Sequence, residues 1–344
     1  MSSLSVGVVG ASGYTGETLI RLLLRHAGCS LDAITSRQQA GLLLGTAVPA
    51  VRGLPGADLT FEDLDPEQAA TLDIGSWFLA LPHGVAAGYA QPLIRAGRQV
   101  IDLSADFRLG DPEVYATYYG QPHPDPDLLR SVPYVIPELA TGTDWLRAPL
   151  LACPGCYPTS IQLALVPLLR QQLIDPDRIV INSASGVTGA GRKADPLYLF
   201  SDRAESMRPY GQPRHRHLSE IEEQLGEAAG RTIQVQFNPH LVPMRIGILS
   251  TITVPARADL QAVYTAWEST YADQPFVAVL PSGTFPDTQD VLGTNRCDLH
   301  AVHDPRTGNL IIHASIDNLM KGAAGQAVQL FNLSRGLPMT QGLC

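Results

Sequence analysis

The segment LSVGVVGASGYTGETLIRLLLRHA, residues 4–27, decides the fold of the N-terminal part of the chain. It begins with a short β-branched run that ends in glycine, and it closes with apolar residues at helical spacing. Between the two, Gly10, Gly13 and Gly16 lie three residues apart. A strand, a glycine turn and a helix in this order predict a dinucleotide-binding βαβ unit, because glycines let backbone N–H groups approach a pyrophosphate at a helix N-terminus. A tight strand–helix turn that binds nothing would use the same residues.

The next predicted strand, LDAIT at residues 31–35, ends where dinucleotide sites discriminate between cofactors. Ser36 and Arg37 follow it, at a place where an NAD site usually has an acidic residue for the ribose hydroxyls. A hydroxyl and a guanidinium suit a 2′-phosphate instead. The sequence therefore predicts NADP as the cofactor.

Two further predicted strands, at 77–82 and 99–104, flank a predicted helix at 84–97. Alternating strands and helices are typical of a parallel sheet, whose ligands bind at the carboxyl ends of the strands. Ser104 and Arg108 follow the second of these strands, so we expect them near a substrate or the nicotinamide.

The pattern changes in the second half of the chain, which predicts a second α+β domain with a mixed or antiparallel sheet. Its predicted elements are a helix at 159–172, a strand at 178–185, a glycine-rich turn at 186–193, strands at 232–239 and 247–256, and a closing helix within 316–338. We therefore predict an α/β protein with a Rossmann-type dinucleotide-binding domain, residues 1–152 plus 318–344. A catalytic and dimerisation domain would comprise residues 153–317.

Composition excludes several classes of function. The net charge of −9 argues against nucleic acid and anionic membranes as partners, because both would be repelled. The 344 residues include five cysteines, too few and too scattered for a disulfide framework. No secretory signal or membrane-spanning stretch is recognisable. We expect a cytoplasmic protein with reduced thiols.

Cys153 and Cys156 form a Cys-x-x-Cys pair that allows three interpretations. Structural zinc is disfavoured because no second pair exists and because His215 and His217 are spaced too closely for a finger. A thioredoxin-like couple is disfavoured by the position in mid-chain. A nucleophilic Cys156 fits better, because the predicted helix that follows would present its positive end to the thiolate. A buried, inert cysteine remains the alternative.

A thiolate nucleophile needs a proton partner, and histidine is the side chain suited to that task near neutral pH. His215 and His217 would point to opposite faces of an extended segment, so only one would reach the site. Glu220 follows His217 by three residues and could orient its imidazole. A solvated basic turn before an acidic helix would have the same sequence. No metal is expected.

The blocks VGVVGASGYTGETL, DLSADFR, PGCYPTS, GVTGAGRK, HRHLSEIEEQ, FNPHLVPM and DNLMKGAAGQAVQ occur in this order. Together they resemble the N-acetyl-γ-glutamyl-phosphate reductase family of arginine biosynthesis, which is similar to aspartate-semialdehyde dehydrogenases. The resemblance implies an NADP-dependent two-domain reductase that assembles as a homodimer or homotetramer. It also implies that Cys156 is the nucleophile and His217 the acid/base.

The same resemblance implies a set of ligand-binding positions. For the cofactor these are Gly10, Ser12, Gly13, Tyr14, Thr15, Gly16, Ser36, Arg37, Ser185, Gly186 and Asn318. For the acyl-phosphate substrate and the released inorganic phosphate they are Ser104, Arg108, Arg192, Lys193 and His215. Two alternatives remain open: the related aminoadipyl-phosphate reductase of lysine biosynthesis, and a non-catalytic NADP-binding sensor.

Overall fold

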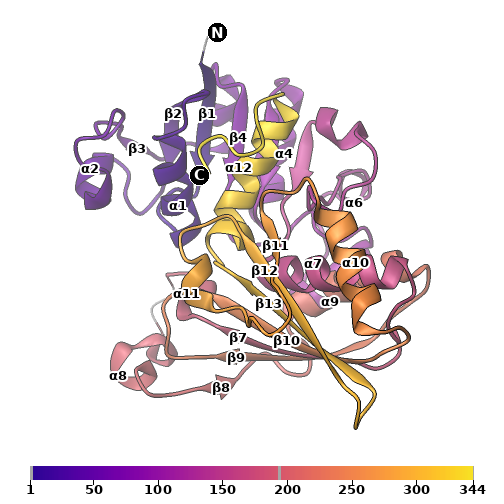
Figure 1. The fold of residues 1–344 in the computed structure, drawn as a ribbon. Coiled ribbons are helices and arrows are strands. Elements are labelled where there is room, and N and C mark those ends of the chain that lie inside the picture. The colour runs from indigo at the N-terminus through magenta and orange to yellow at the C-terminus, as the bar shows by residue number, and fades with distance from the viewer. Residues whose placement is uncertain (1–2, 193–194, 344) are drawn as a thin grey trace. The chain divides into compact units, whose positions relative to one another are not determined.

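The computed structural model describes residues 3–192 and 195–343 and divides into two compact units. Unit 1 comprises Met1–Pro154 and Ala323–Cys344, so it takes in both ends of the chain. Unit 2 comprises Gly155–Gly322. Figure 1 shows the chain from its indigo N-terminus to its yellow C-terminus.

Unit 1 is built on a six-stranded parallel sheet with the strand order β3-β2-β1-β4-β5-β6. The order reverses between β1 and β4, and such a switch point is where α/β sheets bind ligands. The strands are β1 (Leu4–Val9), β2 (Cys29–Thr35), β3 (Phe61–Glu62), β4 (Ser76–Leu79), β5 (Gln99–Asp102) and β6 (Leu150–Ala152).

The helices of unit 1 connect these strands, as the predicted alternation requires. They are α1 (Tyr14–Leu23), α2 (Leu44–Ala47), α3 (Pro66–Thr71), α4 (Ala86–Arg95), α5 (Pro112–Tyr119), α6 (Pro126–Leu129) and the C-terminal α12 (Gly325–Ser334). Helix α12 packs on α1 and β5. Short 3₁₀ turns lie at Pro49–Val51 and Asp144–Arg147.

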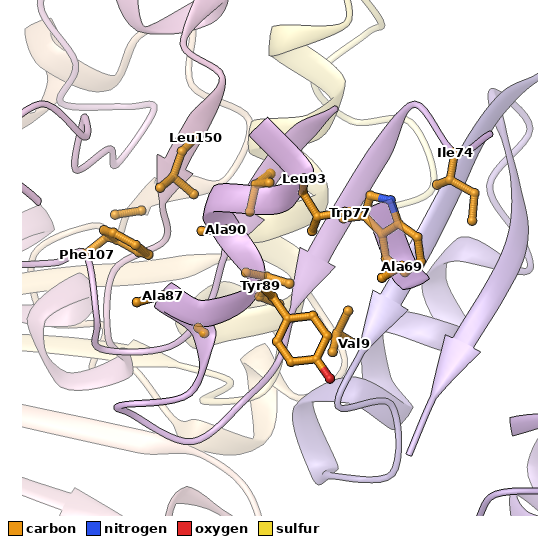
Figure 2. Packing of buried hydrophobic residues seen from close by; sticks show 14 of the residues in the cluster. Val9, Ala69, Ile74, Trp77, Ala87, Tyr89, Ala90, Leu93, Phe107 and Leu150 are labelled. Carbon is orange, nitrogen blue, oxygen red and sulfur yellow. The ribbon is translucent and has the colours of Figure 1, made fainter. Parts of the chain in front are cut away.

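A buried apolar cluster joins the sheet of unit 1 to α4. Figure 2 shows Trp77 of β4 against Leu93 of α4, with Ala90 on the same helix and Phe107 at the other end of the cluster. All four are at most 1% exposed. Their burial supplies the hydrophobic stabilisation that holds α4 on the sheet. It also fixes the loop between β4 and α4 at the carboxyl edge of the sheet.

Unit 2 is built on a seven-stranded mixed sheet with the order β11-β12-β13-β10-β7-β9-β8. The pairs β11–β12 and β7–β9 are parallel, and the other neighbours are antiparallel. The strands are β7 (Ile179–Ser185), β8 (Arg208–Pro209), β9 (Val235–Leu241), β10 (Ile248–Pro255), β11 (Val277–Val279), β12 (Cys297–Asp304) and β13 (Asn309–Ile316).

Three helices of unit 2 pack on this sheet: α7 (Cys156–Arg170), α9 (Arg216–Ala229) and α10 (Leu260–Tyr271). Strand β10 alternates buried and half-buried residues along its whole length, as a strand covered on one face does. The short helices are α8 (Phe200–Arg203) and α11 (Thr288–Val291), and 3₁₀ turns lie at Val187–Ala190 and Pro196–Tyr198.

The structure confirms the Rossmann-type unit and the mixed sheet of the second unit, with differences at particular elements. Helix α7 begins at Cys156, three residues before the predicted start, so the cysteine itself opens the helix. The closing helix begins only at Gly325, after a π-helical turn at Met320–Ala324. The long hairpin β12–β13 had no predicted counterpart. Among the described residues, no helix has the length and hydropathy needed to cross a bilayer.

Candidate active site

Cys156 is the first residue of α7, the most deeply buried helix of unit 2. The N-cap is Gly155, which has no side-chain oxygen to occupy the backbone N–H groups of the first turn. The positive end of this 15-residue helix therefore faces the half-buried thiol and favours an anion there. Gly322 lies against it, because a Cβ at Gly322 would be 2.8 Å from the Cys156 Cβ.

The buried carboxylate of Glu220 ties the start of α7 to α9. Its Oε1 accepts a hydrogen bond of 2.7 Å from the backbone N–H of Gly155. This contact holds the residue that precedes Cys156, since Glu220 lies buried in the first turns of α9. We expected Glu220 to orient His217, and the structure adds this contact with the backbone beside Cys156.

His215 and His217 open α9 and lie close together. His215 is the N-cap and His217 is the second helical residue, with ring centroids 5.1 Å apart. Both rings meet the Tyr157 ring edge to face, at centroid distances of 5.6 Å and 5.9 Å respectively. The expectation that the two imidazoles point to opposite faces is wrong, because it assumed an extended segment and the helix starts here.

Tyr157 and Tyr210 bring a pair of hydroxyls to the same place. Their Oη atoms are hydrogen bonded at 2.8 Å. Burial raises the pKa of both phenols, and the charge of Cys156 adds to this effect in each. The two hydroxyls therefore stay protonated at neutral pH. They offer uncharged hydrogen-bond donors beside the thiol.

The predicted cofactor residues of unit 2 lie around the turn that follows β7. The Asn318 amide links two loops: its Oδ1 accepts from Gly247 N–H at 2.8 Å, and its Nδ2 donates to Thr188 Oγ1 at 3.1 Å. A Cβ at Gly186 would lie 2.7 Å from the Arg245 carbonyl carbon, so the close approach requires glycine. The Ser185 hydroxyl donates to the Gly186 carbonyl. These contacts make the turn a rigid platform.

In unit 1, the glycine turn between β1 and α1 has the shape that a pyrophosphate cradle needs. Gly10 has φ +81°, which favours glycine, and a Cβ there would lie 2.4 Å from the Ala80 carbonyl oxygen. Gly13 is the N-cap of α1, and Tyr14, Thr15 and Gly16 form its first turn. Because a glycine cap offers no side-chain oxygen, the helix N-terminus suits an anion.

The end of β2 carries the residues predicted to read the cofactor phosphate. Ser36 Oγ donates to Ser12 Oγ at 2.8 Å, which joins this strand end to the glycine turn. Arg37 is exposed, and its Nε lies 3.8 Å from a carboxylate oxygen of Asp63. The guanidinium at this position therefore has an acidic neighbour that the sequence pattern did not reveal.

The segment after β5 is held by a buried polar network. Ser104 donates to Asp102 through both its N–H and its hydroxyl, and burial raises the pKa of Asp102 to about 7. Arg108 donates through Nε to the Cys153 carbonyl at 2.9 Å and through Nη2 to the Leu103 carbonyl at 2.8 Å. The guanidinium thus holds the chain three residues before Cys156.

Two predicted cationic residues lie beyond this network. Arg192 is exposed, next to the turn that follows β7. Lys193 lies outside the described residues. Within 3–192 and 195–343, no group of three histidine, cysteine or acidic side chains is arranged to hold a metal ion.

Residues 5–143 match the family model of the semialdehyde dehydrogenase NAD binding domain, and residues 156–318 match that of the semialdehyde dehydrogenase dimerisation domain. The N-acetyl-gamma-glutamyl-phosphate reductase of Akkermansia muciniphila is 49% identical over 100% of this chain and 99% of its own length. That of Pseudomonas aeruginosa is 45% identical over 99% and 98%. The chain belongs to the N-acetyl-gamma-glutamyl-phosphate reductase family.

The fold of this reductase family member is shared with more distant solved structures. Aspartate semialdehyde dehydrogenase II from Vibrio cholerae superposes with a TM-score of 0.72 at 17% identity, covering 97% of this chain and 98% of that one. The Candida albicans aspartate semialdehyde dehydrogenase, solved with NADP, gives 0.71 at 16% identity, covering 97% and 99%. At such low identity the likeness concerns the fold alone.

Sequence reasoning missed four residues at the sites of this reductase. Phe237 reaches the Tyr157–His215 pair from a distant part of the chain, and Tyr210 lies in the polar, proline-containing stretch just before His215, so neither has a periodic signal. Asp63 follows the short strand β3, whose two residues give no periodic signal. Only Tyr157 had a signal, since it directly follows Cys156 in the Pro-Gly-Cys-Tyr-Pro block.

Proposed function

We propose that the protein is an NADPH-dependent N-acetyl-γ-glutamyl-phosphate reductase. It reduces N-acetyl-L-glutamyl 5-phosphate to N-acetyl-L-glutamate 5-semialdehyde, with release of phosphate, in arginine biosynthesis. The observation that carries this proposal is the meeting of two helix starts. Cys156 opens α7, His217 lies in the first turn of α9, and Glu220 of α9 binds the backbone N–H next to the cysteine.

The reaction follows from the chemistry of these residues. The Cys156 thiolate attacks the acyl carbon, the C–O bond to phosphate breaks, and phosphate leaves with the bonding electrons to give a thioester. When bound, NADPH supplies the hydride that reduces the thioester carbonyl. His217 gives a proton to the carbonyl oxygen as the thiohemiacetal forms and takes it back as the C–S bond breaks. The aldehyde leaves, and the thiolate is restored.

Positive side chains must hold an anionic substrate against the net charge of −9. We assign the phosphate and the α-carboxylate to Arg108, Arg192 and Lys193, with Ser104 as a neutral partner. Arg108 suits the phosphate, because its contacts with Cys153 and Leu103 already fix the guanidinium on the chain leading to the nucleophile. Bidentate geometry favours arginine for this task.

The proposed cofactor is NADP, with the pyrophosphate on the glycine turn of Gly10 to Gly16 and the 2′-phosphate at Ser36 and Arg37. The open N-terminus of α1 and the guanidinium at the end of β2 support this choice. We propose Ser185, Gly186 and Asn318 as a platform for the nicotinamide end.

For the whole protein we propose a homodimer or homotetramer, and light scattering of the purified chain would give the number of subunits. The match of residues 156–318 to a dimerisation domain supports assembly. We place the reaction in the cytoplasm, in keeping with the free thiols of Cys29, Cys153, Cys156 and Cys297.

The deciding experiment runs the reaction in reverse. The purified protein is given N-acetyl-glutamate 5-semialdehyde, NADP⁺ and phosphate, and the formation of NADPH is followed by its absorbance. We expect NADPH to form only when phosphate is present. Cys156→Ser should abolish turnover, because an alkoxide is not available near neutral pH. Cys29→Ala is the matched control: burial, then Asp32, raises the pKa of that thiol to about 12, and its loss should leave turnover intact.

Two results would contradict the proposal. Turnover of the aminoadipate-derived semialdehyde in place of the glutamate compound would assign the chain to the lysine pathway. NADPH binding with no turnover of either aldehyde would make it a sensor.

A further inference from the structure

His215 stands where α9 begins, and histidine is an unusual side chain for a helix N-cap. It is the N-cap of the helix, with extended backbone (φ −66°, ψ 141°). Its Nδ1 accepts a hydrogen bond of 3.1 Å from the backbone N–H of His217. Asparagine, aspartate and serine usually provide this acceptor. Since His217 is the residue whose N–H is bound, the cap acts directly on the proposed acid/base.

The His215 ring is packed in a cage of three aromatic rings. Tyr157, Tyr210 and Phe237 each meet it edge to face, with centroids 5.6, 5.4 and 5.5 Å away. They come from α7, from the chain beside β8, and from β9. A shorter capping side chain could supply the hydrogen bond but would leave this cage unfilled.

The cap carries no charge at neutral pH. Burial, assisted by the neighbouring Arg216, lowers the pKa of His215 to about 4. With Nδ1 as acceptor, the neutral ring has its proton on Nε2. The titratable groups that face it are the Tyr157 and Tyr210 phenols, both kept protonated by burial, and His217 itself. Arg216 is the neighbouring charge in α9, and Glu220 lies one turn further along.

We propose that His215 is a positioning residue, which fixes the start of α9 and places His217 in its first turn without adding a charge beside it. This role rests on the proposed function of His217. An aspartate cap would put a carboxylate next to that imidazole and stabilise its protonated form. A neutral cap adds no charge beside the imidazole that gives and takes the proton in the thiohemiacetal steps.

This role differs from that of a substrate ligand, which the family resemblance implied for His215. A ligand would bind through the Nε2–H, and its loss would raise KM whatever residue replaced it. A positioning cap acts on kcat, and a different capping side chain restores it. The two roles therefore predict different kinetic patterns for the same set of variants.

The test compares His215→Ala, His215→Asn and His215→Asp in the phosphate-dependent oxidation of the semialdehyde. We expect His215→Ala to lower kcat by about ten- to a hundredfold with KM changed less than about threefold. His215→Asn should restore much of kcat, because asparagine is a strong cap. His215→Asp should move the acidic limb of the pH profile upward by about one pH unit, since its carboxylate favours the protonated imidazole.

Asp259→Ala provides a matched control at another helix. Asp259 is the N-cap of α10 and accepts from the Ala262 N–H at 2.8 Å, so the variant loses a cap of the same kind away from the site. We expect kcat and the pH profile of this variant to stay at wild-type values. Equal losses of kcat in Asp259→Ala and His215→Ala would assign the effect to general destabilisation.

Other outcomes distinguish a failure of the positioning role of His215 from a failure of the proposed function. If His215→Asn is as impaired as His215→Ala and shows a raised KM, the ring binds substrate and the positioning role is wrong. An unshifted profile in His215→Asp would contradict the role of charge, and this variant keeps a cap even if His215→Ala fails to fold. Absence of wild-type turnover would contradict the proposed function itself, whatever the variants do.

Discussion

Cys156 and Cys29 are both free thiols, and their surroundings differ in the sign of the local field. Cys156 opens a long helix and faces its positive end. Cys29 opens a buried strand near Asp32, and burial together with that carboxylate raises its pKa to about 12. One cysteine is therefore placed where a thiolate is stabilised, and the other is placed where a thiolate is costly. Residue type alone does not distinguish the two.

A second comparison at the residue scale concerns Arg37 and Asp63 at the end of β2. Their side chains are 77% and 58% exposed and 3.8 Å apart, so Asp63 partly neutralises the guanidinium and would repel a 2′-phosphate. We expect Asp63→Asn to bind NADPH about two- to fivefold more tightly, in keeping with the small energies of exposed ion pairs. NADH binding should change little. Fluorescence titration with each cofactor measures the two dissociation constants and hence their ratio.

The control for Asp63 is another exposed carboxylate of unit 1 that pairs with an arginine. Asp73 lies 3.2 Å from Arg98, before β4, and Asp73→Asn removes the same charge from the opposite end of the sheet. This variant should leave both cofactor affinities unchanged. Equal gains for NADPH and NADH in Asp63→Asn would show that the carboxylate does not act on the 2′-phosphate.

At the scale of elements, two positions of the β1–α1 turn are glycine for different physical reasons. A Cβ at Gly16 would lie 2.5 Å from the Gly10 carbonyl oxygen, whereas a Cβ at Gly13 would find only that oxygen at 3.8 Å. We expect Gly16→Ala to lower the free energy of unfolding by about 1–3 kcal/mol, because strand and helix must separate. Gly13→Ala should leave stability nearly unchanged and weaken NADPH binding.

Urea unfolding and cofactor titration of the two glycine variants check these expectations separately. The methyl group of Gly13→Ala would stand at the N-cap of α1, where we place the pyrophosphate. Wild-type affinity for NADPH in this variant would show that the pyrophosphate approaches the backbone elsewhere. Full stability in Gly16→Ala would show that the turn can open without cost.

The elements that the sequence predicted correctly are those with strong local signals. The glycines of the β1–α1 turn and the proline and glycine around Cys156 each mark a boundary within a few residues. The hairpin β12–β13 was missed although Pro305 and Gly308 mark its turn, because no periodic pattern was read on either side, and its His300–His313 pair becomes visible only when the strands meet. The cage around His215 likewise depends on Tyr157 and Phe237 from distant segments, which spacing along the chain does not encode.

For the molecule as a whole, the site depends on helix starts more than on net charge. The chain carries −9 overall, yet its proposed reactive thiol, its cofactor turn and its histidine pair all lie at helix N-termini, where partial positive charge is built into the backbone. Helix dipoles and a few arginines thus provide local positive charge in a chain whose net charge is negative. This placement lets an acidic protein work on two anionic ligands.

Titrating groups whose pKa changes on folding make global stability depend on pH, and the half-buried His215 gives the clearest case. Its pKa falls from 6.5 in the unfolded chain to about 4 in the folded protein. Between these values the unfolded state binds more protons, so the contribution of His215 is complete above pH 6.5 and is lost as the pH falls toward 4. Burial lowers the pKa of His300 and His313 as well, which acts in the same direction.

Asp102 acts in the opposite direction across the same range. Its pKa is raised to about 7, so the folded state binds the extra proton and gains stability as the pH falls. We therefore expect the free energy of unfolding of the wild type to change only gradually as the pH falls. The curve of His215→Asn should differ measurably from it. From pH 7 to pH 4, that variant should lose about 2–3 kcal/mol less of its free energy of unfolding than the wild type does. Urea unfolding at fixed protein concentration measures both curves, and parallel curves would show that His215 titrates alike in the folded and unfolded chains.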